Sequence, residues 1–484
     1  MSTDPMRELC ERGLARLSAD DPELYEVLTT EHRRQASTLS LVASSSVVDP
    51  RVLASQASIA VNVTAEGYPG QRYHAGCQVV DEIERLAVDR AKRAFGARYV
   101  NVQPHSATTA NYAVLSAVLR PGETLLGMAL DQGGHLTHGS PAGFAGRHYR
   151  CLGYGLRPDG LIDYEQVARL AADYRPRVIV CGATAYPRTV DFERFRRIAD
   201  SVGAYLLADI SHTAGLVVAG LHPSPVDHAH VTTTCTHKQL FGPRGGLIMC
   251  GRDYAAPAPR GSGTLADFLQ RTVFPFYQGA PVLNAIAGKA VALGLAATPG
   301  FALLAARIAR IASGLAARLV ELGHHVVSGG TDNHIVLLDV SALGLTGVIA
   351  ERALQDCDIV VNRNRVPGDR TPARVTAGIR IGLNSAARRG LSGPQAVLCA
   401  ELIDQVLRSV HPVGDRDYRL PAPVREAVRA RVAELCAAFP VPGYPAPAAP
   451  APAPASGAAG PPPRAGVRRD TTARWRVSAG AWDR

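Results

Sequence analysis

Short runs of apolar residues alternate along this chain with longer segments whose apolar residues recur every three or four positions. The first pattern is typical of buried strands, and the second of helices that pack on a sheet. Helical spacing is clear over Val79–Phe95, with Gly96 as a stop signal, and over Asp191–Val202. The predicted strands are Tyr99–Val102, Thr124–Met128, Arg150–Gly153, Val178–Cys181, Tyr205–Asp209, Val231–Thr234 and Leu247–Cys250. This alternation predicts an α/β fold with a mainly parallel, seven-stranded sheet that helices cover on both faces.

The pattern changes after a helix predicted near Asn284–Leu295. A long helix rich in Ala, Leu and Arg over 300–323 precedes further strands and a final helix near Pro394–Val410. These strands are predicted at His334–Val340, Asp358–Val361 and Ile379–Leu383. We therefore predict five parts: an N-terminal helical arm (1–60), a large domain (61–295), a smaller α+β domain (296–412), a helical extension (413–440) and a disordered Pro/Ala-rich tail (441–484).

The composition is that of a globular protein, with 46% hydrophobic and 19% charged residues. No apolar run approaches the ~20 residues of a membrane span, and the N-terminus lacks the apolar core of a secretory signal. We expect a cytoplasmic protein without a membrane partner. Nine cysteines without any CxxC pair favour reduced, mostly buried thiols and argue against a disulfide framework or a structural metal.

The formal net charge of +10 raises the question of a nucleic-acid partner. The arginines are spread over many predicted helices, and no recognition helix, zinc finger or RNA-binding motif accompanies them. Solvated arginine faces explain the charge, so we expect no nucleic-acid partner. A positive field would also favour a site that binds phosphate and carboxylate anions.

The chain has three lysines, Lys92, Lys238 and Lys289. Lys92 lies on the polar side of an amphipathic helix, and Lys289 sits in the small-residue run AIAGKAVALGLA. We expect both to be solvated or snorkelling side chains. Lys238 instead lies between two buried strands, after a β-branched run and beside His237. An amine fixed in such a place can capture a carbonyl carbon, so Lys238 is the predicted Schiff-base lysine.

Groups of complementary chemistry follow other predicted strands. Asp209 ends an apolar strand, and a buried carboxylate there needs a cationic partner, such as a protonated pyridine nitrogen. Ser106 and Thr108 stand at a helix start that could hold a phosphate. His135 follows a glycine pair and would present an aromatic ring. An acid and then a lysine at consecutive strand ends, with a phosphate cup upstream, indicate a site for pyridoxal phosphate.

From about Arg33 to Val410 the sequence resembles the serine hydroxymethyltransferases. The resemblance is carried by AEGYPGQRY, NVQPHS, GGHLTHGSP, the AD of LLADISHTAGL, TTTCTHKQLFGPRGG, SGGTDNH and GIRIG. It implies an aminotransferase-like fold whose large domain binds pyridoxal 5'-phosphate, in a homodimer with shared active sites. It also implies aldol and retro-aldol transfer on β-hydroxy-α-amino acids through a glycine quinonoid, with small-molecule amino acid and aldehyde substrates.

The resemblance also implies roles for individual residues. Lys238 would bind the cofactor covalently, and Asp209 would contact its pyridine nitrogen. Glu66 would transfer the proton at the substrate hydroxyl. His135 and His212 complete the implied catalytic set. The implied cofactor-binding residues are Ser106, Ala107, Thr108, His135, Thr184, Asp209, His212, His237, Lys238, Gln278 and Gly279, the last two from the partner subunit. The implied substrate-binding residues are Ser44, Tyr73, His74 and Arg380.

Departures from the family pattern cluster at the substrate end. They include Ser45-Ser46, Thr64, His74, Phe276-Tyr277, Arg365 and Arg374. Because a folate slot would be partly dismantled by these changes, we favour an L-threonine:aldehyde transaldolase of specialised metabolism, such as nucleoside antibiotic biosynthesis. The alternative is a folate-dependent serine hydroxymethyltransferase that uses tetrahydrofolate. A non-catalytic binding protein is a more distant alternative, against which Lys238, Asp209, His135 and Arg380 weigh.

Overall fold

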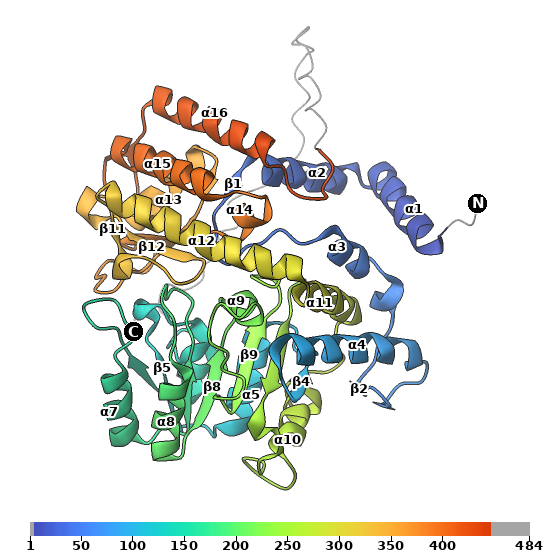
Figure 1. Cartoon of the computed structure of the whole chain (residues 1–484). Coiled ribbons are helices and arrows are strands. Elements are labelled where there is room, and N and C mark those ends of the chain that lie inside the picture. Colours follow the sequence, from blue (N-terminus) through green and yellow to red (C-terminus); the bar gives the residue numbers. More distant parts are fainter. Residues whose placement is uncertain (1–3, 447–484) are drawn as a thin grey trace, which may run out of the picture. The chain divides into compact units, whose positions relative to one another are not determined.

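The computed structural model describes residues 4–446 (Figure 1). The chain up to Pro445 forms one compact unit. The predicted disorder of the tail (441–484) falls, from residue 447 on, outside the described residues. The predicted division into five parts stays a prediction.

A seven-stranded sheet forms the centre of the larger half of this unit. Its strand order is β4-β10-β9-β8-β7-β5-β6, and β10 runs antiparallel to both neighbours while the remaining pairs are parallel. The strands are β4 (Tyr99–Asn101), β5 (Thr124–Met128), β6 (Arg150–Tyr154), β7 (Val178–Cys181), β8 (Tyr205–Asp209), β9 (Val231–Cys235) and β10 (Gly246–Cys250). The predicted α/β class with a mainly parallel sheet is confirmed.

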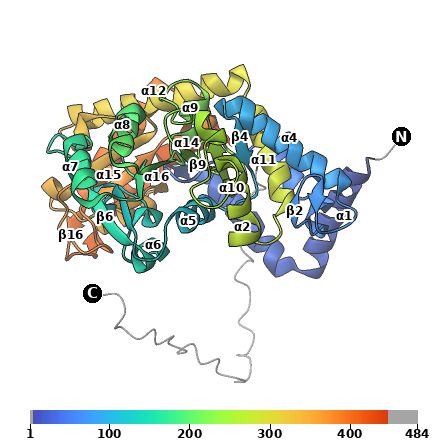
Figure 2. The same cartoon turned by 90° about the horizontal axis from the view of Figure 1, so that it is seen from below.

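Helices cover both faces of this sheet, as Figure 2 shows from below. Successive strand residues alternate between two cores, so Leu126 packs in one core and its neighbour Leu125 in the other. Burial on both faces explains why the strands are continuous apolar runs in the sequence. The covering helices are α4 (Gln78–Phe95), α7 (Tyr164–Tyr174) and α8 (Phe192–Val202) on the first face, and α5 (Ala107–Val118), α6 (Phe144–His148) and α10 (Leu265–Arg271) on the second.

A four-stranded antiparallel sheet, in the order β11-β12-β15-β14, forms the centre of the C-terminal half. Its strands are β11 (His325–Val326), β12 (Ile335–Asp339), β14 (Asn362–Asn364) and β15 (Gly378–Gly382). Its main helices are α12 (Pro299–Glu321), α13 (Gly347–Asp356) and α15 (Gly393–Ser409). The predicted strand Asp358–Val361 does not join this sheet. Only β13 (Ile359–Val360) forms there, and it pairs in parallel with β1 (Leu39–Ser40).

Helix α12 is, within residues 4–446, the one helix long and apolar enough to cross a membrane. Its apolar stripe is buried in the core and packs on α15. Because this stripe is buried, the high hydropathy of α12 is that of a core helix. The buried residues of the stripe are Phe301, Leu304, Ala305, Ile308, Ile311, Ala312, Leu315, Ala316 and Leu319.

The N-terminal helices are tied to the end of the compact unit through one buried arginine. Arg389 donates hydrogen bonds to five backbone carbonyls near the C-terminal ends of α2 (Pro22–Ser37) and α16 (Ala422–Ala438). The guanidinium thereby satisfies carbonyls that a helix end leaves without partners. The remaining helices are α1 (Pro5–Asp20), α3 (Pro50–Gln56), α9 (Ala214–Val218), α11 (Leu283–Ala296) and α14 (Asn384–Arg388).

The prediction that Lys289 is a solvated or snorkelling side chain is wrong. Lys289 lies on α11, is only 2% exposed, and its Nζ donates to the carbonyls of Val102 (2.6 Å), Pro104 (3.0 Å) and Gly246 (3.1 Å). The Lys289 side chain reaches from α11 to the segment after β4 and to the start of β10. A Cβ added at Gly245 would come within 2.1 Å of Lys289 Cε, so the glycine leaves the space for this side chain.

The cysteines are mostly buried, as predicted. All nine are free, and seven of them are buried while Cys10 and Cys151 are half-buried. Burial raises the pKa of Cys181, Cys250 and Cys399, for the last two to about 12. These thiols therefore act as small apolar core residues.

Candidate active site

A cavity of about 350 Å³ surrounds Lys238 at the carboxyl ends of the central strands. Helix-start, loop and strand-end residues from distant parts of the chain converge on it, including Arg380 from β15 of the other sheet. In an open α/β sheet this edge is where ligands bind. The predicted site residues that line it are Ser44, Ser106, Ala107, Thr108, His135, Thr184, Asp209, His212, His237, Lys238 and Arg380.

Asp209, at the end of β8, is held as a carboxylate by four hydrogen bonds. Its Oδ2 accepts from Asn111 Nδ2 (2.7 Å) and His138 Nε2 (3.2 Å), and its Oδ1 accepts from Ser211 N (2.9 Å) and Ser211 Oγ (2.6 Å). Burial opposes its ionisation, but the bonds from His138 and Ser211 together with nearby His135 keep the pKa of Asp209 below its ordinary value. An ionised acid therefore lines the cavity, where it can pair with a pyridinium N–H.

His135 and His138 form a chain of hydrogen bonds that leads to Asp209. His138 Nδ1 accepts from His135 N (3.4 Å), so its Nε2 carries the proton donated to Asp209. Burial lowers the pKa of His135 to about 4, and its Nδ1 accepts from Thr137 N (3.2 Å). The ligand atoms of His135, His138 and Asp209 lie within 4.8 Å of one another, a spacing that a metal site also shows. The hydrogen bonds already engage both ring nitrogens of His138, which favours a positioning chain.

The opposite end of the cavity has the features of a phosphate cup. Ser106 caps α5, and its Oγ accepts from Thr109 N (3.0 Å). The N–H groups of the first helical turn have no partner within the helix and attract anions. Gly246 packs against the cup so closely that an added Cβ would lie 2.3 Å from Ser106 O. Arg244, which was not predicted as a site residue, lines the cavity and adds a positive charge.

Lys238 and Arg380 bring two basic groups into the cavity. Burial lowers the pKa of the Lys238 amine, against the raising effect of Cys235 and Asp209, which favours the neutral nucleophile. Arg380 is 6% exposed, and burial lowers its pKa to about 10. Its Nη1 donates to Thr184 O (2.6 Å) and its Nε to Asn362 Oδ1 (3.1 Å). Within residues 4–446 the remaining nitrogen, Nη2, has no acceptor, and it can bind a carboxylate.

Two buried histidines stack beside the cavity. The rings of His212 and His334 have centroids 5.5 Å apart and are nearly parallel, with Nδ1 and Nε2 3.4 Å apart. Burial lowers the pKa of both, for His334 to about 3, so both rings are neutral near pH 7. Among the described residues, His212 Nε2 and His237 Nδ1 are buried without partners. Such orphaned donors or acceptors on a cavity wall fit a polar cofactor with phosphate and phenolic oxygens.

Five predicted site residues do not reach this cavity in a single chain. Glu66, Tyr73, His74, Gln278 and Gly279 lie instead on two neighbouring loops, which we call the second cluster. Tyr73 N donates to Glu66 O (3.0 Å), and a Cβ added at Gly279 would lie 3.3 Å from Glu66 Oε1. The Tyr73 ring is 76% exposed.

Sequence reasoning missed several residues that line or support the cavity. They are polar residues that line the cavity or hydrogen-bond to residues that line it: Asn111, His138, Ser211, Arg244 and His334. His138 was signalled by its place three residues after His135, and Ser211 by its place two residues after Asp209. No pattern along the chain marks Asn111.

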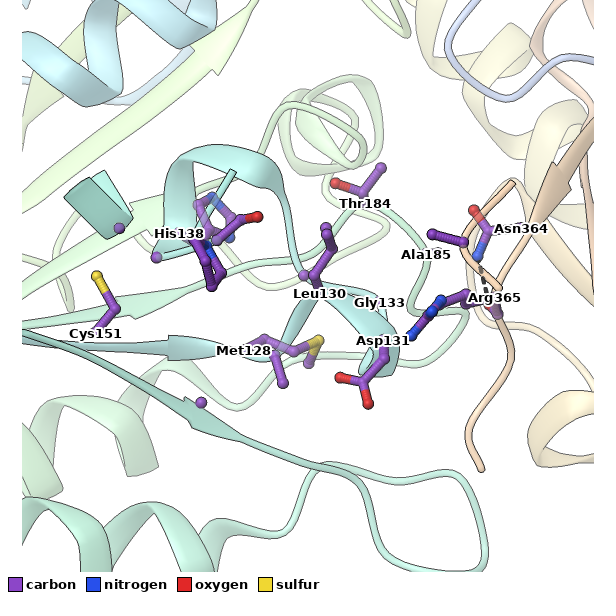
Figure 3. A pocket seen from close by; sticks show the side chains of 18 of the residues that line it. Met128, Leu130, Asp131, Gly133, His138, Cys151, Thr184, Ala185, Asn364 and Arg365 are labelled. Carbon is purple, nitrogen blue, oxygen red and sulfur yellow. Dashed lines mark hydrogen bonds between the residues drawn. The ribbon is translucent and has the colours of Figure 1, made fainter. Parts of the chain in front are cut away.

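A larger cavity of about 760 Å³ adjoins the first (Figure 3). Thr184 and His138 line both cavities. The segment of β14 and the loop after it contributes Arg363, Asn364 and Arg365, whereas Arg374 is exposed and not part of the lining.

Comparison with known proteins shows the family of the chain. The family model described as serine hydroxymethyltransferase matches residues 17–403. The chain is 46% identical over 423 residues to a protein of Halorhodospira halophila named serine hydroxymethyltransferase, covering 87% of this chain and 97% of that protein. It is 47% identical over 426 residues to a protein of the same name from Alkalilimnicola ehrlichii, and this match covers 88% of this chain and 97% of that protein. The chain therefore belongs to the serine hydroxymethyltransferase family, whose members are pyridoxal-phosphate-dependent transferases.

Proposed function

We propose that this protein transfers the hydroxymethyl group of L-serine to tetrahydrofolate and releases glycine. The observation that carries the proposal is one cavity holding the Lys238 amine, the Asp209 carboxylate and the Arg380 guanidinium. Both relatives bear the name of the folate-dependent enzyme. The comparisons give no support to the L-threonine:aldehyde transaldolase that we favoured from the sequence, and they support its alternative better. A cytoplasmic location is part of the proposal.

The residues present fit pyridoxal phosphate. Lys238 would bind its carbonyl carbon, Asp209 its ring nitrogen, and Ser106 and Thr108 its phosphate, while His135 would lie against its ring. His212 Nε2, which is buried and orphaned in residues 4–446, would bond one of its oxygens. When bound, the cofactor supplies an electron-accepting ring that stabilises negative charge at the substrate Cα.

The substrate would be oriented by its carboxylate. Arg380 is fixed by Thr184 O and Asn362 Oδ1, so its free edge presents a charge-assisted hydrogen bond in one geometry. Ser44 lines the same cavity and can add a hydroxyl. This anchor would hold the bond between Cα and Cβ in the orientation in which it breaks, and Glu66 would accept and return the proton of the β-hydroxyl.

Glu66 can act there only if a second copy supplies it. Large apolar side chains near the second cluster are exposed: Ile59, Val61, Tyr73, Phe276 and Val282 are each 47% or more accessible. Such a patch indicates a protein interface. A homodimer in which each second cluster completes the partner's Lys238 cavity would cover the patch and bring Glu66, Tyr73, His74, Gln278 and Gly279 to the site.

One observation keeps the transaldolase as a second candidate. The larger cavity, which adjoins the site of Arg380, is lined by Arg365, an unusual residue for a folate slot. An acceptor aldehyde with polar or charged groups would suit this lining.

The deciding experiment incubates the purified holoenzyme with L-serine and tetrahydrofolate, and separately with L-threonine and candidate aldehydes. Folate-dependent formation of glycine at a rate well above that with L-threonine supports the proposal. Acetaldehyde release that requires a second aldehyde, without folate-dependent turnover of L-serine, would replace it with the transaldolase.

A further inference from the structure

Arg365, which has no acidic partner among residues 4–446, lines the larger cavity beside the Lys238 site. The cavity of about 760 Å³ is large enough for a small-molecule ligand. Thr184 forms part of the wall between the larger cavity and the Lys238 cavity. The carbonyl of Thr184 accepts the hydrogen bond from Arg380. A molecule in the larger cavity therefore adjoins a substrate held by Arg380.

The Arg365 guanidinium has hydrogen-bonding capacity to spare. Its Nη2 donates to Thr371 O (3.2 Å), while its Nε is buried without an acceptor among the described residues. Neighbouring Arg363 is instead paired with Glu351 at 2.6 Å. Figure 3 shows the Arg365 side chain directed towards Asp131 and Gly133 across the cavity. Among residues 4–446 no carboxylate, Asp131 included, lies within 4.0 Å of the Arg365 guanidinium.

The loop that carries Arg365 is braced before any ligand binds. Asp369 accepts hydrogen bonds from Thr371 N (2.8 Å), Thr371 Oγ1 (2.6 Å) and Ala377 N (2.8 Å). Asn364 Nδ2 donates to Arg365 O (2.6 Å). Because Thr371 in turn accepts from Arg365, these contacts hold the guanidinium in place. Less conformational entropy is then lost when an anion binds.

We propose that Arg365 is a specificity-determining residue that binds an anionic group of the acceptor, remote from the acceptor's reacting atom. A planar guanidinium recognises carboxylate or phosphate oxygens. Arg365 lines the larger cavity, which shares Thr184 and His138 with the Lys238 cavity. The inference rests on the proposed function, because it requires an acceptor. The anion has two possible sources, the glutamate carboxylates of tetrahydrofolate or a phosphate on an aldehyde.

The test measures KM for two matched pairs of acceptors with the holoenzyme. The first pair, used with L-serine, is tetrahydrofolate and its diamide, in which both glutamate carboxylates are neutral. The second pair, used with glycine, is D-glyceraldehyde 3-phosphate and D-glyceraldehyde. The variants are Arg365→Gln and Arg365→Lys. Arg370→Gln is the control, since Arg370 is exposed on the same loop and outside the cavity lining.

We expect the holoenzyme and the Arg370→Gln control to prefer the anionic member of one pair. Arg365→Gln should raise KM for that member about ten- to hundredfold and change KM for the neutral member much less. Arg365→Lys should retain most of the preference, which also shows that the loop tolerates substitution. Equal changes for both members, or no preference in the unsubstituted protein, would overturn the inference.

The two pairs separate this inference from the proposed function. Transfer to tetrahydrofolate and to its diamide with equal KM leaves the proposed function standing and removes the anion site. If the protein uses the phosphorylated aldehyde with a KM that depends on Arg365, but transfers nothing from L-serine to folate, the anion site stands and the proposed function falls. If the protein uses no acceptor of either pair, both the anion site and the proposed function are contradicted.

Discussion

Lys289 is the residue whose replacement tests most sharply how the fold supports the site. Its ammonium donates to three backbone carbonyls, those of Val102, Pro104 and Gly246, in a region without solvent access. The first two carbonyls belong to the segment that leads from β4 into the Ser106 cup, and the third belongs to the start of β10. The ammonium therefore holds together two segments that meet at the phosphate end of the cavity.

Lys289→Met keeps the length of the side chain and removes its charge and all donors. Pro104 O keeps the hydrogen bond from Gly246 N (2.9 Å), so within residues 4–446 the carbonyls of Val102 and Gly246 are the ones that lose a donor without a replacement. Each such carbonyl costs about 1–3 kcal/mol. The loss is partly offset because burial already disfavours the charged amine and lowers the pKa of Lys289 to about 7. We expect the free energy of unfolding to fall by about 2–4 kcal/mol, from two carbonyls at about 1–3 kcal/mol each less this offset. We also expect the dissociation constant of pyridoxal phosphate to rise about tenfold, because the Ser106 cup loses its support.

The assay compares urea unfolding, followed by circular dichroism in excess cofactor, with equilibrium cofactor binding. Lys92→Met is the matched control on the polar side of α4, where a surface substitution changes stability by about 0.5 kcal/mol or less. If Lys289→Met unfolds at the same urea concentration as the control and binds the cofactor equally well, the three hydrogen bonds do not stabilise the fold or the cup.

Further predictions address the substrate, the dimer and the buried histidines. Arg380→Ala should raise KM for L-serine by about a hundredfold while cofactor absorbance persists, since it removes a buried charge-assisted contact; an unchanged KM would contradict its role. Mixing inactive Lys238→Ala and Glu66→Ala under subunit exchange should restore about a quarter of the activity, because one site in each mixed dimer is intact; no restoration would refute a shared site. Burial lowers the pKa of His334 to about 3, so the unfolded chain takes up a proton first as pH falls below 6.5. The free energy of unfolding of the cofactor-free protein should therefore decrease from pH 6.5 towards 4, and His334→Asn should make this decrease shallower; identical slopes by urea titration would show that His334 does not contribute.

The strands of the central sheet could be predicted because burial on both faces makes each one a continuous apolar run. Thr124–Met128, Val178–Cys181 and Tyr205–Asp209 are predicted and observed with the same bounds. β14 escaped prediction because it reads Asn-Arg-Asn and gives no apolar signal. β1 is two residues long and depends on a partner more than 300 positions away, at Ile359–Val360.

The site could be predicted where a chemical group follows a strand, as for Asp209 and Lys238. Residues whose meaning depends on a partner from another element could not. Lys289 has an ordinary helical neighbourhood in sequence, and only the folded structure brings its side chain beside three carbonyls from the segment after β4 and the start of β10. Asn111 likewise acquires its role through Asp209, which lies 98 positions further along the chain.

Reduction of the holoenzyme with borohydride, followed by peptide mass spectrometry, tests the central claim most directly. Reduction fixes an imine between pyridoxal phosphate and a lysine as a stable amine, and the chain offers Lys92, Lys238 and Lys289 as candidates. The account predicts that the pyridoxyl phosphate mass appears on the peptide containing Lys238 and is lost, with the cofactor absorbance, in Lys238→Ala. A label on Lys92 or Lys289, or an unlabelled chain that still turns over L-serine, would contradict it.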